Sequence, residues 1–86
     1  MTFIVQIPKK VERKLTHLPN SVIDKILHHL KILSNNPFPQ KFKKLHNRDG
    51  YRLRVGDYRI IYEVDLAEKR IIILRIAHRQ DVYKGK

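Results

Sequence analysis

Two stretches of this sequence decide its fold: residues 51–64 read YRLRVGDYRIIYEV, and residues 70–83 read RIIILRIAHRQDVY. In the first stretch, apolar or aromatic residues alternate with arginines. A period of two residues indicates β-strands that have one apolar face and one basic face. The dipeptide Gly56-Asp57 separates two such strands and is typical of a two-residue hairpin turn. The sequence therefore predicts an antiparallel hairpin with strands near 50–55 and 58–65.

The hairpin turn also determines which arginines face each other. If Val55 pairs with Tyr58, then Arg54 lies directly opposite Arg59, and like charges in that arrangement destabilise a sheet. Clustered arginines suit phosphate in particular, because the planar guanidinium group matches phosphate oxygens. We therefore expect this pair to be presented to an anion.

The other elements follow from hydrophobic periodicity and from the positions of proline. Residues 2–7 predict a short strand that ends at Pro8, residues 9–18 a short helix, and residues 22–33 a helix with a wide apolar stripe. Residues 37–49 are interpreted as a basic connection, and a last strand is predicted near 70–78. The predicted order is β-α-α-β-β-β, an α+β fold with two N-terminal helices packed on one face of a small, mostly antiparallel four-stranded sheet.

The last strand is apolar on both sides over residues 71–74, so periodicity alone leaves its phase open. If Asp65 pairs with Lys69 around the loop 66–68, then Arg59 lies opposite Arg75, and Arg79 follows on the same face. The other phase would turn Arg75 and Arg79 inward, and burying unpaired cations is expensive. The register that gathers the arginines on the open face is therefore preferred. The opposite, helix-covered face is predicted to carry Tyr51, Leu53, Val55, Tyr58, Ile60, Tyr62 and Val64.

Composition narrows the functional classes. The chain has 86 residues with 19 Lys+Arg against 8 Asp+Glu, a net charge of +11. The length predicts a single domain over residues 1–86, and the charge favours nucleic acid or an acidic protein as a partner. The absence of cysteine excludes a disulfide framework and a thiolate metal site, and no apolar run approaches the roughly 18 residues of a membrane span. We expect a cytoplasmic protein without membrane contact, metal or cofactor.

Three motifs carry a resemblance to a known family: GYRLR at 50–54, DYRIIY at 57–62 and HRQDVY at 78–83. In these motifs the chain resembles the RelE/ParE superfamily of bacterial and archaeal toxins, and its RelE side in particular. The resemblance implies a ribosome-dependent endoribonuclease, or mRNA interferase, that cuts messenger RNA in the ribosomal A site. It further implies cleavage without a metal, by attack of the ribose 2′-oxygen on the adjacent phosphate. The implied partners are the ribosome with its 16S ribosomal RNA, messenger RNA, and a cognate acidic antitoxin in a heteromeric complex.

The resemblance also implies a set of cleavage residues, held here by Arg52, Arg54, Arg59, Arg79 and Tyr83. The reaction must remove a proton from the 2′-hydroxyl, stabilise the phosphorane and protonate the 5′-oxygen. Arg59 and Arg79 suit the charge of the phosphorane. Tyr83 is suited to stacking on a base.

The identity of the proton acceptor stays open, because RelE-like relatives often carry lysines where this chain has Arg52 and Arg54. Arginine is effectively never deprotonated, so these two side chains are expected to stabilise a developing 2′-oxyanion. His78 is the other candidate base, since it adjoins Arg79 and imidazole titrates near neutrality.

Further basic residues are expected to contact RNA through charge, and two other functions stay open. The expected RNA-binding residues are Lys41, Lys43, Lys44, His46, Arg48 and Arg75. One alternative function is inhibition of DNA gyrase, as in the ParE-type toxins that share the fold. The other is a catalytically weak module that binds nucleic acid without cutting it, which the exchange of lysine for arginine keeps open. The retained Arg79 and Tyr83 favour the nuclease.

Overall fold

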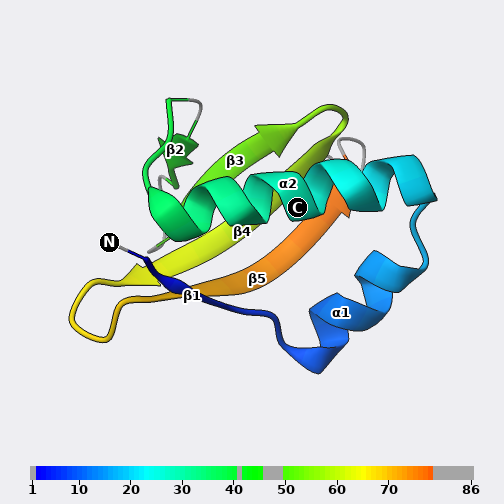
Figure 1. Cartoon of the computed structure of the whole chain (residues 1–86). Helices are drawn as coiled ribbons and strands as arrows, with labels where there is room; N and C mark the ends of the chain where they lie inside the picture. Colours follow the sequence, from blue (N-terminus) through cyan, green and yellow to red (C-terminus); the bar gives the residue numbers. More distant parts are fainter. Residues whose placement is uncertain (1, 41, 46–49, 79–86) are drawn as a thin grey trace.

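The computed structural model describes residues 2–40, 42–45 and 50–78. Its elements are β1 (Ile4–Gln6), α1 (Lys9–Thr16), α2 (Asn20–Asn35), β2 (Phe42–Lys44), β3 (Tyr51–Val55), β4 (Tyr58–Asp65) and β5 (Arg70–His78). The strands form one sheet in the order β1-β5-β4-β3-β2, in which only the β1–β5 pair is parallel. Helix α2 lies across one face of the sheet, and α1 lies beside the end of β5 (Figure 1).

The predicted α+β fold is confirmed, but the sheet has five strands where the sequence predicted four. The extra strand is β2, which lies within the segment interpreted as a connection. Its three residues read Phe-Lys-Lys, a run too short and too polar to show a period of two. Pairing with the edge of β3, and not local pattern, makes this segment a strand.

Prolines set the starts of both helices. Pro8 and Pro19 occupy the N-cap positions with extended backbone angles, and no side-chain cap is present. Their carbonyl groups accept the first backbone hydrogen bonds, from Glu12 N–H at 2.9 Å and from Val22 N–H at 2.9 Å. Proline suits these positions because it cannot extend a helix backwards and its carbonyl remains available.

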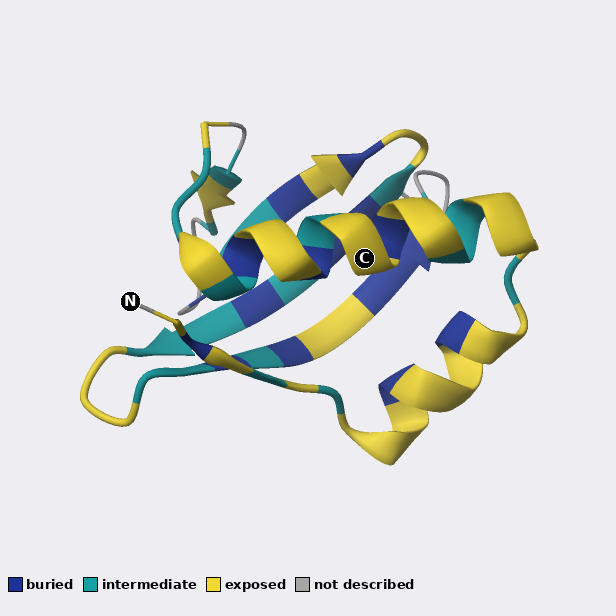
Figure 2. Cartoon of the chain, in the orientation of Figure 1, coloured by how far each residue is buried: buried dark blue, intermediate teal, exposed yellow. Residues whose placement is uncertain are grey.

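The core lies between the helices and the apolar face of the sheet, as Figure 2 shows. On α2 the buried residues are Ile26, Leu30 and Leu33, one helical turn apart, whereas Leu27 of the same apolar stripe is 47% exposed. Tyr62 of β4 is fully buried, and its hydroxyl donates a hydrogen bond of 2.8 Å to the Pro37 carbonyl oxygen. Because burial removes water from this hydroxyl, and Tyr51 adds a smaller Coulombic contribution, the pKa of Tyr62 lies well above its ordinary value.

The register of β5 differs from the one predicted. Asp65 pairs with Arg70, and not with Lys69, so the loop is one residue longer than expected. The ladder then shifts: Tyr62 pairs with Ile73 but its neighbour Ile61 pairs with Arg75, which leaves Leu74 as the extra residue of a β-bulge. Arg75 therefore lies opposite Ile61, and the predicted pairing of Arg59 with Arg75 is wrong; Arg59 pairs with Ala77.

Candidate functional site

Cationic side chains gather on the face of the sheet that α2 does not cover. Paired residues on neighbouring strands share a face. The pairs Arg54–Arg59, Arg52–Ile61 and Ile61–Arg75 therefore place the arginines of three strands on one surface. Lys43 joins them because it pairs with Arg52 across β2 and β3. We call this surface the basic face; it consists of Lys43, Arg52, Arg54, Arg59 and Arg75.

The strand pairing confirms the predicted hairpin and the predicted position of Arg54 opposite Arg59. Val55 pairs with Tyr58 around Gly56-Asp57, and Gly56 has a φ of 59°, which the tight turn requires. Arg54 consequently lies directly opposite Arg59, as the sequence predicted. Two guanidinium groups in adjacent positions repel each other and also form a ready site for a shared anion.

The described residues leave the donors of the basic face poorly satisfied. Arg54 Nε donates to the Gly56 carbonyl oxygen at 3.4 Å, and Arg59 Nη1 donates to the Tyr58 carbonyl oxygen at 3.4 Å. Both distances are longer than the usual range of about 2.7–3.2 Å, so these hydrogen bonds are weak. Within residues 2–40, 42–45 and 50–78, none of the cations of the basic face forms an ion pair. The guanidinium groups therefore keep donors for an external anion.

Arg59 differs from its neighbours in being buried. Only 8% of its surface is exposed, whereas Arg54 and Arg75 are exposed. A buried cation whose one hydrogen bond to the described residues is long stays in place at a cost in stability. Low local dielectric also strengthens its attraction for an anion, so Arg59 is the best placed of the cluster to stabilise concentrated negative charge.

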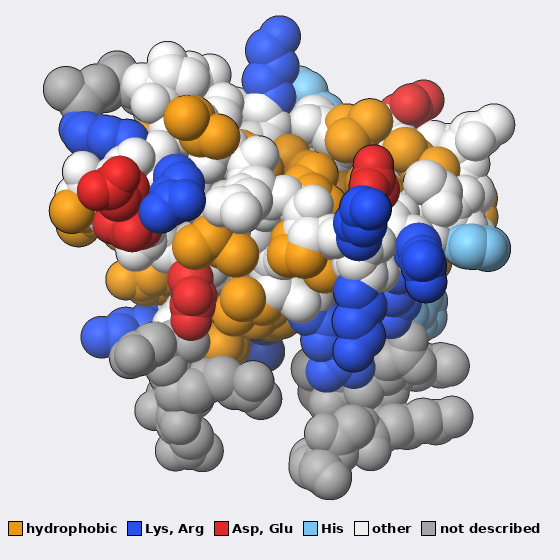
Figure 3. Space-filling view, turned by 90° about the horizontal axis from the view of Figure 1, so that it is seen from below, with side chains coloured by type: hydrophobic (Ala, Val, Ile, Leu, Met, Phe, Trp, Pro, Cys, Tyr) orange, Lys and Arg blue, Asp and Glu red, His pale blue; other side chains and the backbone are white. Residues whose placement is uncertain are grey.

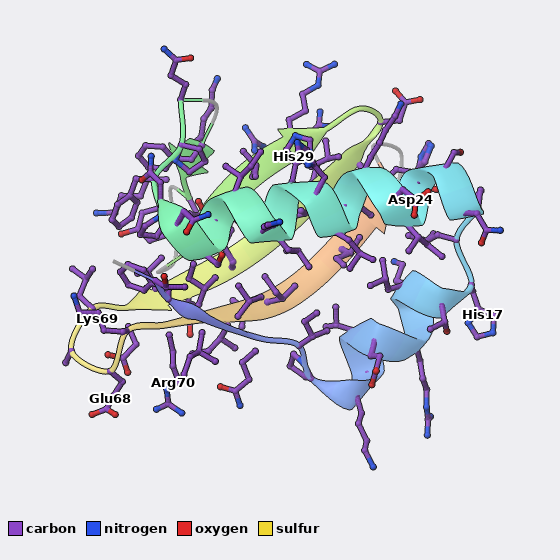
Figure 4. All side chains as sticks on the ribbon, viewed as in Figure 1. His17, Asp24, His29, Glu68, Lys69 and Arg70 are labelled. Carbon is purple, nitrogen blue, oxygen red and sulfur yellow. The ribbon has the colours of Figure 1, made fainter. Side chains whose placement is uncertain are left out.

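The charge of this face of the sheet changes from positive to negative along β4. Beyond Ile61 it continues through Glu63, which pairs with Ile72, to Asp65, which pairs with Arg70. Figure 4 shows Glu68, Lys69 and Arg70 at the β4–β5 loop, at the opposite end of the sheet from His17. A polyanion is therefore drawn toward the end that carries Arg54 and Arg59, and away from the loop.

His78 lies on the opposite face from the arginines. It pairs with Tyr58, and the two rings meet edge-to-face with centroids 5.1 Å apart, on the helix side of the sheet. The structure thus does not bring His78 together with the basic face, and its catalytic role stays a prediction. Arg79 and Tyr83 lie outside the described residues.

The predicted RNA-binding residues that the structure describes also lie on both faces of the sheet. Lys43 and Arg75 belong to the basic face, whereas Lys44 pairs with Tyr51 and lies on the other side of the sheet. Lys44 borders a shallow hollow of about 360 Å³, which is also lined by Gly50, Tyr51, Glu63 and Val64. Lys41, His46 and Arg48 lie outside the described residues.

The edge of the basic face rests on an aromatic cluster. Tyr51 contacts the rings of Phe38, Phe42 and Tyr62, with centroids 5.2–5.8 Å apart. Gly50 precedes this cluster with a φ of 128°, and a Cβ there would meet Leu45 Cδ1 at 3.2 Å. These contacts hold β2 against β3 and so fix Lys43 beside Arg52.

Histidines and carboxylates do not converge on a metal site in the described part of the chain. His17, directly after α1, lies apart from Asp24 and His29 of α2 (Figure 4). The Nδ1 atoms of both histidines instead lie 2.7–2.8 Å from backbone carbonyl oxygens one turn earlier, those of Arg13 and Lys25. The same part of the chain contains no helix long and apolar enough to cross a membrane.

The comparison with known families decides the assignment. A family model described as "ParE toxin of type II toxin-antitoxin system, parDE" matches residues 5–83. The chain belongs to the RelE/ParE family of type II toxin–antitoxin toxins. It is 39% identical to a Methanocaldococcus jannaschii protein named "Putative toxin RelE1", and the match covers 99% of each chain.

Solved structures of RelE toxins have the same fold. The RelE–RelB complex of Pyrococcus horikoshii matches with a TM-score of 0.83 and 38% identity, over 92% of this chain and 97% of that one. The RelBE2 complex of Mycobacterium tuberculosis matches with a TM-score of 0.81 and 26% identity, over 92% and 100% of the two chains. The isolated Escherichia coli RelE toxin, at 16% identity and a TM-score of 0.77, shares the fold.

The sequence missed one contribution to this surface, and for Arg75 it predicted the correct face but the wrong partner. Lys43 was recognised as basic, but its position beside Arg52 depends on a strand that the pattern did not reveal. The phase of Arg75 depends on a bulge at Leu74 within an apolar run. An apolar run that is one residue too long for its partner strand is the signal that could have indicated the bulge.

Proposed function

We propose that this toxin is a ribosome-dependent endoribonuclease that cuts messenger RNA in the ribosomal A site and is neutralised by an acidic antitoxin. The observation that supports this most is the basic face, where Arg54 lies opposite Arg59 and both keep weakly bonded donors. A phosphorane with two negative oxygens is the kind of group that such a pair stabilises. A shallow sheet face does not position RNA by itself, so the ribosome supplies the remaining contacts and the in-line geometry.

In this mechanism each cation has a separate task. Arg59 stabilises the phosphorane, because it is buried and lies in the middle of the cluster. Arg52 and Arg54 stabilise the 2′-oxygen as it loses its proton, and Arg75 binds an adjacent phosphate. Arg79 and Tyr83 are proposed, from the family pattern alone, to add a second phosphorane contact and a stacked base.

Proton transfer requires a group that can exchange a proton, which arginine cannot do. Among the described residues, two such groups are neighbours of Arg52 in the strand register, on the same face of the sheet. Lys43 pairs with Arg52 directly, and Glu63 lies two residues beyond Ile61, the partner of Arg52 on β4. We assign Glu63 to accept the 2′-proton and Lys43 to donate a proton to the 5′-oxygen. His78 would have to act from the opposite face.

The experiment is a brief expression of the toxin in cells with mapping of messenger RNA 5′ ends and of DNA breaks. We expect new RNA 5′ ends within translated regions and none on the same transcripts when initiation is blocked. Purified toxin should cut naked messenger RNA poorly. Efficient, specific cleavage of naked RNA would refute the requirement for the ribosome.

Inhibition of DNA gyrase is the second candidate function, because the matching family model is described as a ParE toxin. It predicts DNA breaks that depend on gyrase, and intact transcripts. The same mapping experiment therefore separates the two functions. If the toxin is an endoribonuclease, a variant without Arg59 should lose RNA cleavage. If it inhibits gyrase, Arg59 has no catalytic role.

A further inference from the structure

Ile61 is an apolar residue at the centre of the basic face. It pairs with Arg52 on one side and with Arg75 on the other, and its neighbours on the same face of β4 are Arg59 and Glu63. Ile61 is half-buried, so part of its surface stays exposed between these four charged residues. A sheet face that meets water usually carries polar residues. The exposed part of Ile61 is therefore available to an apolar part of a ligand.

The arginines around Ile61 form two sites for anions. Arg54 and Arg59 are directly opposed, with Cβ atoms about 4.5–5.5 Å apart, and form the first site. Arg75 comes two residues before Ala77, the partner of Arg59, so it lies diagonally from Arg59 at about 7–8 Å. This arrangement suits two successive phosphates of one RNA strand, the first at the Arg54–Arg59 pair and the second at Arg75.

The position of Ile61 between these two sites suits the sugar of a nucleotide. Ile61 lies directly opposite Arg75, and it is two residues, about 6.4–6.8 Å, from Arg59 along β4. Two successive phosphates of RNA are joined through one ribose, and the carbon atoms of that ribose form an apolar surface. A ribose that links a phosphate at Arg75 to a phosphate at Arg59 would therefore lie over Ile61.

The groups that flank Ile61 indicate which ribose this is. Arg52 is the direct partner of Ile61, Glu63 comes two residues later on β4, and the proposed reaction assigns both to the 2′-hydroxyl. The ribose over Ile61 would then carry the attacking 2′-oxygen, and its 3′-oxygen would lead to the scissile phosphate at Arg59. On this path the RNA runs from its 5′ side at Arg75 of β5 toward its 3′ side at β3.

The distribution of charge favours this path across the strands. Figure 3 shows acidic side chains at the left, where the β4–β5 loop lies in Figure 1, and a column of Lys and Arg side chains at the right. On β4 itself, Glu63 and Asp65 lie between Ile61 and that loop. An RNA strand that followed β4 would bring its phosphates to these carboxylates, whereas a strand that crosses from β5 to β3 keeps them near arginines.

We propose that Ile61 is a positioning residue, which packs under the ribose of the attacking nucleotide and holds its 2′-oxygen between Arg52 and Glu63. This inference rests on the proposed function, because it requires cleavage by a 2′-oxygen. Phosphates bound at two sites still allow the ribose between them to rotate, and contact with the branched side chain of isoleucine restricts that rotation. A displacement of about 1 Å at an attacking atom can lower a rate by about 10²-fold.

The first test compares wild type, Ile61→Ala and Ile61→Val in single-turnover cleavage on ribosomes that carry a defined messenger RNA, with ribosome affinity measured in parallel. The matched control is Ile72→Ala, a half-buried isoleucine on the same face whose partners are Gln6 and Glu63 in place of arginines. At saturating toxin, Ile61→Ala should cleave about 10²-fold more slowly, with an affinity within about threefold of wild type. Ile61→Val keeps the branched side chain and should stay within about tenfold of the wild-type rate. Ile72→Ala should cleave at the wild-type rate.

The second test changes the RNA and keeps the toxin intact, so it does not depend on the folding of an Ile61 variant. The phosphate on the 5′ side of the attacking ribose is replaced by a neutral methylphosphonate. Cleavage by wild type should slow by about tenfold or more, as for the loss of a charge-assisted hydrogen bond, whereas Arg75→Met should show little further loss. The same replacement on the 3′ side of the leaving nucleotide should affect wild type and Arg75→Met equally.

The outcomes separate this inference from the proposed function. If wild type cuts no RNA on ribosomes, the proposed function fails and the inference fails with it. If wild type cuts RNA and Ile61→Ala is as active as Ile72→Ala, the proposed function stands and Ile61 has no positioning role. A loss that occurs only in ribosome affinity would also overturn the proposal. Coupling of Arg75 to the phosphate on the 3′ side would place the leaving nucleotide over Ile61 and would overturn it as well.

Discussion

Replacement of Arg59 by methionine should stabilise the toxin and abolish its activity. Arg59 is 8% exposed, lies opposite Arg54, and makes one hydrogen bond, of 3.4 Å, to the described residues. Removing a like-charge pair from a sheet gains about 0.2–1 kcal/mol. Replacing a buried, poorly paired charge by an apolar side chain of similar length is neutral or gains up to roughly 4 kcal/mol. We expect a net gain of at least about 1 kcal/mol, which for a domain of this size raises Tm by about 4–8 °C.

The assay is urea and thermal denaturation of wild type and Arg59→Met at low and high salt, combined with cleavage on ribosomes. The gain should shrink at about 1 M salt, where the Debye length is near 3 Å and the repulsion is screened. Arg75→Met is the matched control, since Arg75 is exposed on the same face and lies opposite Ile61, so its stability should change by no more than about 0.5 kcal/mol. Cleavage should fall by about 10²–10³ for Arg59→Met, as for loss of one transition-state donor. A destabilised Arg59→Met protein, or an equal gain for Arg75→Met, would refute the reasoning.

Three further predictions concern residues that support the sheet around the site and the proton transfer in the proposed reaction. Tyr62→Phe should cost about 1–3 kcal/mol in urea denaturation, because the buried Pro37 carbonyl oxygen loses its donor. The pKa of Tyr62 is raised, so its contribution to stability is complete below pH 10.0 and is lost as the pH rises above that value. The free energy of unfolding of wild type should therefore fall more steeply there than that of Tyr62→Phe, and equal slopes would contradict the burial argument. Lys43→Arg should keep ribosome binding but lower single-turnover cleavage by about 10²-fold, because arginine retains the charge and not the exchangeable proton; full activity would remove Lys43 from proton transfer. Gly50→Ala should lower the unfolding free energy by about 1–3 kcal/mol, since the φ of 128° and the contact with Leu45 both oppose a Cβ, whereas an unchanged value would mean that the loop adjusts freely.

The sequence alone predicted the central hairpin and its basic face, because both depend on local signals. Alternation along residues 51–64 sets the two faces, and Gly56-Asp57 fixes the register through the turn. The pairing of Arg54 with Arg59 follows from those signals without any long-range information. Apart from β2, the element order was predicted for the same reason, since prolines and apolar stripes mark both helices.

The parts that sequence reasoning missed depend on contacts between distant residues. β2 becomes a strand only because Phe42 and Lys43 pair with Leu53 and Arg52, and its own three residues carry no period. The bulge at Leu74 lies in an apolar run where either phase looks acceptable. Both features alter the candidate site, since one adds Lys43 to the basic face and the other determines the direction of Arg75.

The bulge explains how one strand serves both the core and the site. Ile71 and Ile73 point to the core, so strict alternation would also turn Arg75 to the core and Ile76 outward. Ile76 is 1% exposed, and exposing such a side chain costs about 1.5–3 kcal/mol, while an unpaired arginine in its place costs several more. Adding Leu74 as an unpaired residue avoids both costs and leaves an exposed leucine beside α1. The same extra residue thus keeps Ile76 in the core and adds Arg75 to the cationic surface that is proposed to hold RNA.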